Sequence, residues 1–441
     1  MRLPHSNGHL VAFVGRHHAT RQALITATAF LLLAILGHSQ TCSQADVQAA
    51  VNAATDGQTV SVPAGNCTWS SPVTWTDKNI AVIGAGIGVT NITASGQAFN
   101  IVNGSKASWR ISGMTFVYAD STKYLILITN NGNTSVSGWR IDHIRVNQTG
   151  SAGTGNAFQI IGMTWGLIDH LTYDNNNNAV EAINNYAYSN SFDSPSNIGG
   201  IAWTKALDPG GPTAVYVEDS TFNFNGGNPQ VAVNDIQYGG RMVIRHNVIH
   251  GGLTMSHAAW DSVRGAQKME IYNNTIDATG GTRPFLLRSG FNLVFSNTVT
   301  GTWNLGNTIY IDNVRDTPGT GNSCNVGHTQ CSGSQIYDNN SAGGKGYLCE
   351  DQIGTGAGDL QHQNAQPSYF WNNNIPVVIN GACDPTQVSG GIVHVVAGRD
   401  YFDNGTAMPS YTPYTYPHPL QGAVTSPPPP VPPTQLSAIA H

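Results

Sequence analysis

The feature that most constrains the fold is a short strand-like motif that recurs along the chain. Each copy alternates apolar and polar residues, breaks at polar residues and then resumes, as in KMEIYNNTIDA from Lys268 to Ala278. Aligned on a central apolar residue, the copies lie at Ile111, Ile141, Ile168, Val217, Ile244, Ile271, Val294, Ile336 and Phe370. A period of about 20 to 50 residues built from short strands is typical of a solenoid, in which each coil covers the apolar face of the previous one.

The break in each repeat predicts a tight corner. Several repeats carry Asn three residues after the central position: Asn247, Asn274, Asn297, Asn339 and Asn373. Asparagine is depleted in strands because its amide competes with the backbone for hydrogen bonds. Stacked amides at a bend can instead bond from coil to coil, as in the Asn ladders of cross-β assemblies. The long step after Ile168 leaves room for an insertion or an unassigned repeat, and the step after Val294 contains the Cys324 to Cys331 loop.

Both ends of a solenoid need protection from edge pairing and from solvent. Near the first repeats, SQADVQAAVNAA combines a capping box at Ser43 and Asp46 with an apolar helical face, which predicts a helical cap. We expect the Tyr-, Pro- and Thr-rich segment from Tyr401 to Pro419 to wrap the last coils. The Pro-rich residues 426–441 indicate a stiff linker or a tail.

Composition limits the classes of function. Only 10% of the 441 residues are charged, against about 25% in an ordinary soluble domain, and 50 residues are glycine, which favours many turns. The formal net charge is -6, and no basic run suited to nucleic acid occurs. We therefore expect no nucleic-acid partner.

Residues 1–39 have the layout of a secretory signal. Arg16 and Arg21 precede an apolar run from Ala23 to Leu36, and small residues stand where cleavage after Ser39 requires them. The run is shorter than the roughly 20 residues that a membrane-spanning helix needs, and an uncleaved anchor is the alternative. We expect residues 40–425 to form one secreted domain that has no contact with a membrane after cleavage.

The six cysteines all follow that segment. An even number of cysteines in an exported chain favours disulfides, although six thiols allow about 15 connectivities. We expect pairing between neighbours in the sequence: Cys42–Cys67, Cys324–Cys331 and Cys349–Cys383. No C-x-x-C spacing occurs, which argues against a zinc site.

The segment DVQAAVNAATDGQTVSVPAG and the repeated NNT-type corners resemble the right-handed parallel β-helix proteins of the pectin-lyase-like superfamily. The resemblance covers about Cys42 to Pro419 and bears on fold more than on function. It implies an all-β, right-handed parallel β-helix solenoid with an N-terminal helical cap. Members are mostly exported and mostly act on polysaccharides, so an extracellular polysaccharide is the expected partner. We expect the protein to be a monomer.

One row of side chains should face outward beside the central positions. The residue after each central residue is, coil by coil, Ser112, Asp142, Asp169, Glu218, Arg245, Tyr272, Phe295, Tyr337 and Trp371. Coils stack at about 4.8 Å, so these side chains are neighbours on one surface. Aromatic faces can stack on sugar rings, which makes Glu218, Arg245 and Tyr272 candidates for a saccharide-binding strip. The alternative is cross-strand pairing, of Glu218 with Arg245 and of Asp142 with Arg140.

The loop HGGLTMSHAAWDSVRG concentrates His and Arg in a chain that is otherwise poor in charge. β-Elimination of a uronate requires removal of the proton next to a carboxylate and stabilisation of the resulting negative charge. Imidazole suits the first task, and the fixed fork of arginine suits the second. His257 is therefore the candidate base, with Arg264 and Arg288 holding the substrate carboxylate. His250 and Arg283 are candidates for further substrate contacts.

Two other activities stay open. Hydrolysis needs two carboxyls about 5 to 9.5 Å apart, and these could come from Glu218, Asp219 and Asp235, or from Asp142 with Asp169. The chain lacks the Arg-Ile-Lys element of the β-helix polygalacturonases, which argues against that particular hydrolase. The other alternative is a non-catalytic module that binds carbohydrate or attaches to a surface.

Calcium is the cofactor that the resemblance suggests. Acidic residues on adjacent coils bind calcium in pectate lyases of this type, and Asp142 and Asp169 hold such positions here. Two carboxylates fall short of the six to eight oxygens that calcium prefers, so backbone oxygens and water would complete the site. No other cofactor is expected.

Overall fold

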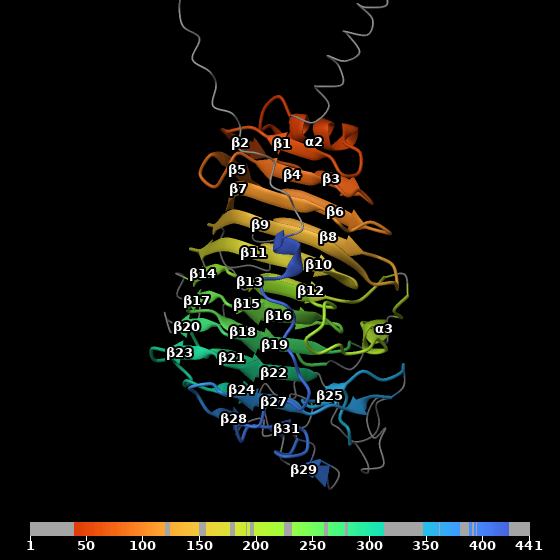
Figure 1. Ribbon diagram of the computed structural model, residues 1–441, viewed down its shortest axis with the longest axis vertical. Helices are drawn as coiled ribbons and strands as arrows, with labels where there is room; N and C mark the ends of the chain where they lie inside the picture. Colours follow the sequence, from red (N-terminus) through yellow and green to blue (C-terminus); the bar gives the residue numbers. More distant parts are fainter. Residues whose placement is uncertain are drawn as a thin grey trace, which may run out of the picture.

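The computed structural model describes residues 39–119, 124–149, 156–176, 181–190, 192–194, 198–224, 232–259, 263–277, 281–312, 347–360, 362–379, 388–389, 392–393 and 395–422. Its strands form three parallel columns around one apolar core (Figure 1), which confirms the predicted all-β, parallel β-helix fold. Through the middle of the stack, each coil contributes a strand to each column. A tight corner separates the first column from the second.

The first two columns belong to one 17-stranded sheet. Three long strands run through both columns: β7 (Arg110–Tyr118), β9 (Val136–Gln148) and β11 (Thr164–Asn175). The first column also contains β1 (Thr59–Val62), β4 (Ala81–Gly84), β13 (Val215–Glu218), β16 (Arg241–Arg245), β19 (Lys268–Tyr272), β22 (Phe291–Phe295), β27 (Ser368–Trp371) and β31 (Tyr401–Phe402). The second also contains β2 (Gly65–Trp69), β5 (Thr90–Ala94), β14 (Thr221–Phe224), β17 (Val248–His250), β20 (Thr275–Asp277) and β23 (Thr298–Thr300).

The third column is a ten-stranded sheet. Its strands are β3 (Val73–Thr76), β6 (Phe99–Asn103), β8 (Ile126–Asn130), β10 (Phe158–Ile161), β12 (Glu181–Tyr186), β15 (Ala232–Gln237), β18 (Leu253–Ser256), β21 (Phe285–Leu287), β24 (Ile309–Ile311) and β28 (Val377–Ile379). Two small antiparallel pairs lie outside the columns: β25 (Thr355–Gly356) with β26 (Asn364–Ala365), and β29 (Val388–Ser389) with β30 (Ile392–Val393).

The predicted register is confirmed along the first column, with one exception. Paired positions run through Ile111, Ile141, Ile168, Val217, Ile244, Ile271, Val294 and Phe370. β11 pairs directly with β13, so the long step after Ile168 is an insertion. β22 likewise pairs directly with β27, so the prediction of a coil centred on Ile336 between them is wrong. Ile336 itself lies outside the described residues.

The asparagine ladder at the corner is confirmed for the described coils. The side-chain Nδ2 of Asn247 donates to Oδ1 of Asn274 (3.0 Å), Asn274 to Asn297 (2.9 Å) and Asn297 to Asn373 (3.1 Å). Asn339 lies outside the described residues. The residue before each ladder position has positive φ, for example 57° at His246 and 55° at Asn273. Because this left-handed backbone is unfavourable for L-residues, the buried amide bonds help to hold the corner in place.

The N-terminal cap is a helix, as predicted. In α2 (Gln44–Ala53), the Ser43 hydroxyl accepts a hydrogen bond from the Asp46 amide (3.2 Å), and Val47 and Val51 are fully buried. Cys42 forms the expected disulfide with Cys67. Cys349 is also disulfide-bonded. The other predicted members of disulfides, Cys324, Cys331 and Cys383, lie outside the described residues.

The C-terminal segment runs further than expected. After β31 it turns back along the outside of the first column and ends in α4 (Pro419–Gly422), beside β9 and β11 (Figure 1). We call residues 408–422 the C-terminal strap. A second short helix, α3 (Gly200–Trp203), belongs to the insertion between β12 and β13.

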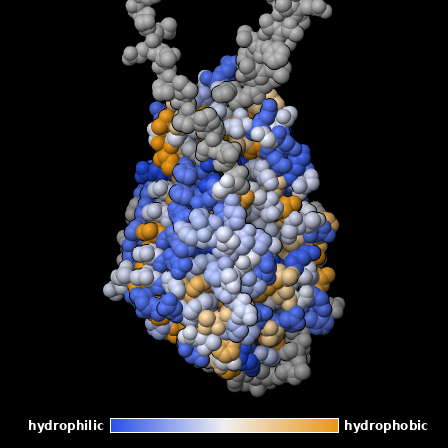
Figure 2. All heavy atoms as spheres, in the orientation of Figure 1, coloured by the Kyte–Doolittle hydropathy of each residue, from blue (hydrophilic) through white to orange (hydrophobic). Residues whose placement is uncertain are grey.

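The molecular surface in the same orientation is mostly hydrophilic, with small hydrophobic patches (Figure 2). Each helix within the described ranges is too short or too polar to cross a membrane.

Candidate functional site

The residues predicted to carry function lie on three different surfaces. Glu218, Arg245 and Tyr272 face outward from the first column, in the predicted row with Asp142 and Asp169. His250 belongs to the second column. His257, Arg283 and Arg288 lie beside the third column, and Arg264 is buried. The three surfaces differ in which hydrogen-bonding groups are already paired within the protein, and this decides what each can bind.

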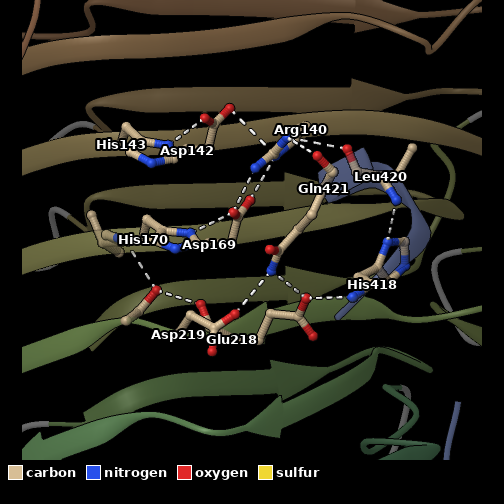
Figure 3. Close-up of polar contacts among 12 residues, drawn as sticks. Arg140, Asp142, His143, Asp169, His170, Glu218, Asp219, His418, Leu420 and Gln421 are labelled. Atoms are coloured by element: carbon tan, nitrogen blue, oxygen red, sulfur yellow. Dashed lines mark hydrogen bonds and ion pairs between the residues drawn. The ribbon is translucent and has the colours of Figure 1, made fainter. Parts of the chain in front are cut away.

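From β9 to β19 the outer face of the first column is covered by the C-terminal strap, and Figure 3 shows His418, Leu420 and Gln421 of the strap beside Arg140 and Glu218. The Arg245 guanidinium is fully buried and donates to the carbonyl oxygens of Tyr414 (2.6 Å) and Thr415 (2.8 Å). Glu218 is fully buried as well, bonded to Arg245 (2.6 Å) and to the His418 amide (2.8 Å). Because the strap and neighbouring side chains take up the hydrogen bonds of Glu218, Arg245 and Tyr272, these groups are not available to a saccharide while the strap is in this position.

The carboxylates considered for calcium are already neutralised by arginine. Asp142 accepts two hydrogen bonds of 2.6 Å from Arg110, and Asp169 accepts two of 2.8 Å from Arg140. Burial favours the neutral form of Asp142, but bonds from Arg110 and His143 outweigh it and hold its pKa well below the usual range. Across the described ranges, no group of three or more His, Cys, Asp or Glu is placed to hold a metal. These residues, as arranged, do not fit a calcium ion, which prefers unpaired oxygens.

Arg264 and His250 have local partners of their own. Arg264 is 1% exposed, donates to both Asp351 oxygens (2.6 to 2.9 Å) and lies 4.4 Å over the Trp203 ring. His250 bonds through Nδ1 to Asp277 on the next coil. Both side chains are therefore held by carboxylates, Arg264 in the interior and His250 on the second column.

The outer face of the third column holds the remaining candidates, and we call it the third-column face. One outward row contains paired residues from successive coils: Gln159, Asn184, Asp235, Met255, Leu286 and Tyr310. Two residues further along each strand is a second row: Tyr186, Gln237, His257, Arg288 and Asp312. Coils are about 4.8 Å apart, so His257 and Arg288 are direct neighbours.

His257 and Arg288 act on the same buried carboxyl. Burial raises the pKa of Asp235, while the charges of His257 and Arg288 and a hydrogen bond with Tyr186 oppose that rise. The Arg288 side chain is 28% exposed and its Nε lies 3.4 Å from the Asp312 carboxylate. Arg283 lies 3.7 Å over the Tyr310 ring, one coil further on. The face thus joins a half-buried imidazole, an accessible guanidinium and a carboxyl that is shielded from water.

A second carboxyl on this face was missed by the sequence reasoning. Burial, together with the charge of the neighbouring Asp235, raises the pKa of Glu181 to about 8. Tyr186, Gln159 and Asn184 were missed as well. Aligning FQII, EAINNY and AVNDIQ, three third-column strands, would have indicated them, but only the first column carries the clear Asn-marked repeat.

No protein-family model matches the sequence, and no curated protein matches it. Among solved structures, a mutant of the PL6 family alginate lyase AlyGC is similar at 14% identity, with 87% of this chain and 57% of that chain covered and a TM-score of 0.33. A mutant catalytic domain of a GH87 alpha-1,3-glucanase in complex with tetrasaccharides is similar at 13% identity, with 77% and 65% covered and a TM-score of 0.30. This chain thus spans less than two thirds of either protein, and at these TM-scores neither likeness bears on its chemistry.

Proposed function

We propose that the protein is a polysaccharide lyase that cleaves a uronate-containing polymer by β-elimination on the third-column face. One observation carries the proposal: His257 and Arg288 stand on successive coils, and both act on the buried Asp235 carboxyl. A base and a fixed cation at neighbouring positions are what the reaction needs, because a proton must leave a carbon whose attached carboxylate gathers negative charge.

The roles follow from the groups present. His257 Nδ1 lies 3.2 Å from the Ala258 carbonyl oxygen, so we assign the proton to Nδ1 and the lone pair to Nε2. Nε2 takes the proton from the carbon next to the uronate carboxylate, while Arg288 pairs with that carboxylate. The electron pair of the broken C–H bond forms the carbon–carbon double bond and the glycosidic oxygen leaves. Burial raises the pKa of Asp235, which favours its protonated form, so we assign Asp235 as the acid that protonates that oxygen.

A matched pair of histidine variants tests the proposal. Purified protein is incubated with pectate, alginate and glycosaminoglycans, and the ultraviolet absorbance of unsaturated product is followed. We expect His257→Ala to lower the rate about 100- to 10,000-fold, the range for loss of a general base. His250→Ala, which removes a histidine bonded to Asp277 on another face, should leave the rate unchanged. Equal loss in both variants, or unsaturated product that persists without His257, would contradict the proposal.

Hydrolysis is the second candidate, because Glu181 and Asp235 are two carboxyls on the same face and the charge of Asp235 raises the pKa of Glu181. A carboxyl with a raised pKa is suited to act as the acid in glycoside hydrolysis. New reducing ends without unsaturated product, lost in Glu181→Gln, would favour this reaction. Retention on the polymer without either signal would instead favour a binding module.

A further inference from the structure

We propose that the third-column face also contains an uncharged subsite, formed by Gln159 and Asn184 beside Asp235, which binds a neutral sugar of the same polymer. The substrate would then be a mixed polysaccharide, in which uronates alternate or are interspersed with neutral sugars, rather than a pure polyuronate. The choice of substrate rests on the proposed function, whereas the subsite itself rests on the observations below.

The first observation is a row of buried polar atoms without partners. Gln159 is 1% exposed, Asn184 3% and Asp235 6%, and the three are paired residues on successive coils. Both side-chain polar atoms of Gln159, together with Oδ1 of Asn184 and Oδ1 of Asp235, make no hydrogen bond within the described part of the chain. Buried polar groups in native proteins nearly always have a partner. Four such atoms along one outward row therefore lack the partner that buried polar groups need, and a ligand bound on this face can supply it.

The second observation is the chemistry of these atoms. A side-chain amide offers a carbonyl acceptor and an NH₂ donor, and a sugar hydroxyl both donates and accepts, so the two are complementary. Aromatic rings stand beside the row: Tyr238 packs edge-on against Tyr186 (4.8 Å between ring centroids) and Tyr188 (5.3 Å). Such rings can pack against the apolar face of a sugar. Amides with an aromatic border suit a pyranose ring better than an ion.

The third observation is the sign of the charge at this end of the face. The ionisable groups next to the amides are Glu181 and Asp235, both acids whose pKa values are raised by burial. When ionised they repel a uronate carboxylate, and when protonated they offer it no positive charge. The guanidinium groups of Arg288 and Arg283, and the His257 imidazole, lie further along the coil axis. The face is therefore neutral or acidic at one end and cationic at the other.

The distance along the solenoid axis between the two ends of the face matches a small number of sugar units. Asn184 is two coils from His257 and three from Arg288. At about 4.8 Å per coil, Asn184 and the proposed catalytic groups are about 10 to 14 Å apart, which is two or three sugar units along the solenoid axis. A polymer lying along the rows would place a neutral sugar over Gln159 and Asn184 and its uronate at His257 and Arg288.

Binding to an inactive variant tests the subsite separately from catalysis. In the His257→Ala background, calorimetric titration would compare an oligosaccharide of alternating uronate and neutral amino sugar with an oligogalacturonate of equal length. We expect tighter binding of the mixed oligosaccharide. Adding Gln159→Met or Asn184→Leu should weaken that binding about tenfold, as expected for one lost hydrogen bond, and change oligogalacturonate binding less than about twofold.

A fold control accompanies the titration. Gln159→Met replaces an amide whose polar atoms are both unpaired and should leave the melting temperature of the free protein unchanged or raise it. Asn184→Leu also removes the hydrogen bond from Asn184 Nδ2 to the Tyr186 hydroxyl (3.2 Å), so it should lower the melting temperature slightly. Asn223→Leu, on the second column where Asn223 bonds to Asp174, should not affect either titration. Equal weakening of both oligosaccharides, or none, would overturn the subsite. If the unmodified protein cleaves none of the polymers but the binding preference is found, the lyase is refuted and the subsite stands.

Discussion

At the scale of single residues, burial separates the candidate catalytic groups from those that hold the structure. His257 and Arg288 keep part of their surface on the third-column face, whereas Arg264 is buried and bonded to Asp351 under Trp203. The sequence of the loop does not show which of its His, Arg and Asp residues are structural and which are catalytic. Their environments differ because a buried guanidinium must be paired, and Arg264 is paired with a carboxylate 87 positions away.

This difference predicts opposite outcomes for two arginine variants. Arg264→Met leaves the buried Asp351 carboxylate unpaired, and we expect it to lower the free energy of unfolding by about 3 to 5 kcal/mol. Arg145→Met breaks a 2.8 Å hydrogen bond to Asp174. Because the Arg145 side chain is 50% exposed, this variant should lower the free energy of unfolding by less than about 1 kcal/mol. Urea unfolding measures both. A stable Arg264→Met that has lost only activity would instead return Arg264 to the catalytic group.

At the scale of the elements, the corner between the first and second columns determines how coils stack. Asn274 shows how many hydrogen bonds one ladder residue makes. Its Nδ2 donates to Asn297 Oδ1 and to the carbonyl oxygens of Ile244 and Tyr272. Its Oδ1 accepts from the backbone and side-chain N–H groups of Asn247. A single amide thus satisfies groups on three coils. The repeated Asn is visible in the sequence for this reason, since no other side chain combines that donor and acceptor at such a short reach.

Adjacent asparagines in KMEIYNNTIDA provide a matched test of the ladder. Asn274→Ala leaves several buried backbone and side-chain groups unpaired, and we expect a loss of about 2 to 4 kcal/mol in the free energy of unfolding. Asn273→Gly changes an exposed residue with φ of 55°, a conformation that glycine adopts readily, so its effect should stay within about 1 kcal/mol. Thermal unfolding compares the two. Similar losses would mean that the backbone turn, and not the amide ladder, stabilises the corner.

At the scale of the whole molecule, the C-terminal strap connects the end of the chain to coils near its middle. Its carbonyl oxygens accept hydrogen bonds from Arg245 and Arg140, and its His418 is 6% exposed. Burial, with help from the charges of Arg245 and Arg140, lowers the pKa of His418 to about 4. His418 Nδ1 accepts a hydrogen bond from the Leu420 amide (3.1 Å), and protonation would remove that acceptor.

Acid should therefore loosen the strap. The pKa of His418 is lower in the folded state than its ordinary value of 6.5, so the released segment binds more protons between pH 6.5 and about 4. The stability that His418 contributes is present above that window and is lost as the pH falls through it. We expect faster hydrogen exchange in residues 408–422 at pH 5 than at pH 7.5, after correction for intrinsic rates. His418→Phe cannot be protonated and should show a smaller difference; an equal difference would assign the effect to another group, such as Glu218.

The sequence by itself determined the solenoid, its register along the first column, the asparagine corner and the helical cap. The solenoid, its register and the corner are repeated, so each copy of the motif predicts the same local structure. The helical cap depends only on residues close together in the sequence. The tertiary structure alone decided which outer faces are covered. The strap closes the row of Glu218, Arg245 and Tyr272 through contacts such as Arg245 to Tyr414, 169 residues apart, while His257, Arg288 and Asp235 meet on the third column. Contacts between distant segments depend on where the chain returns after the last coil, and no periodic pattern records that path.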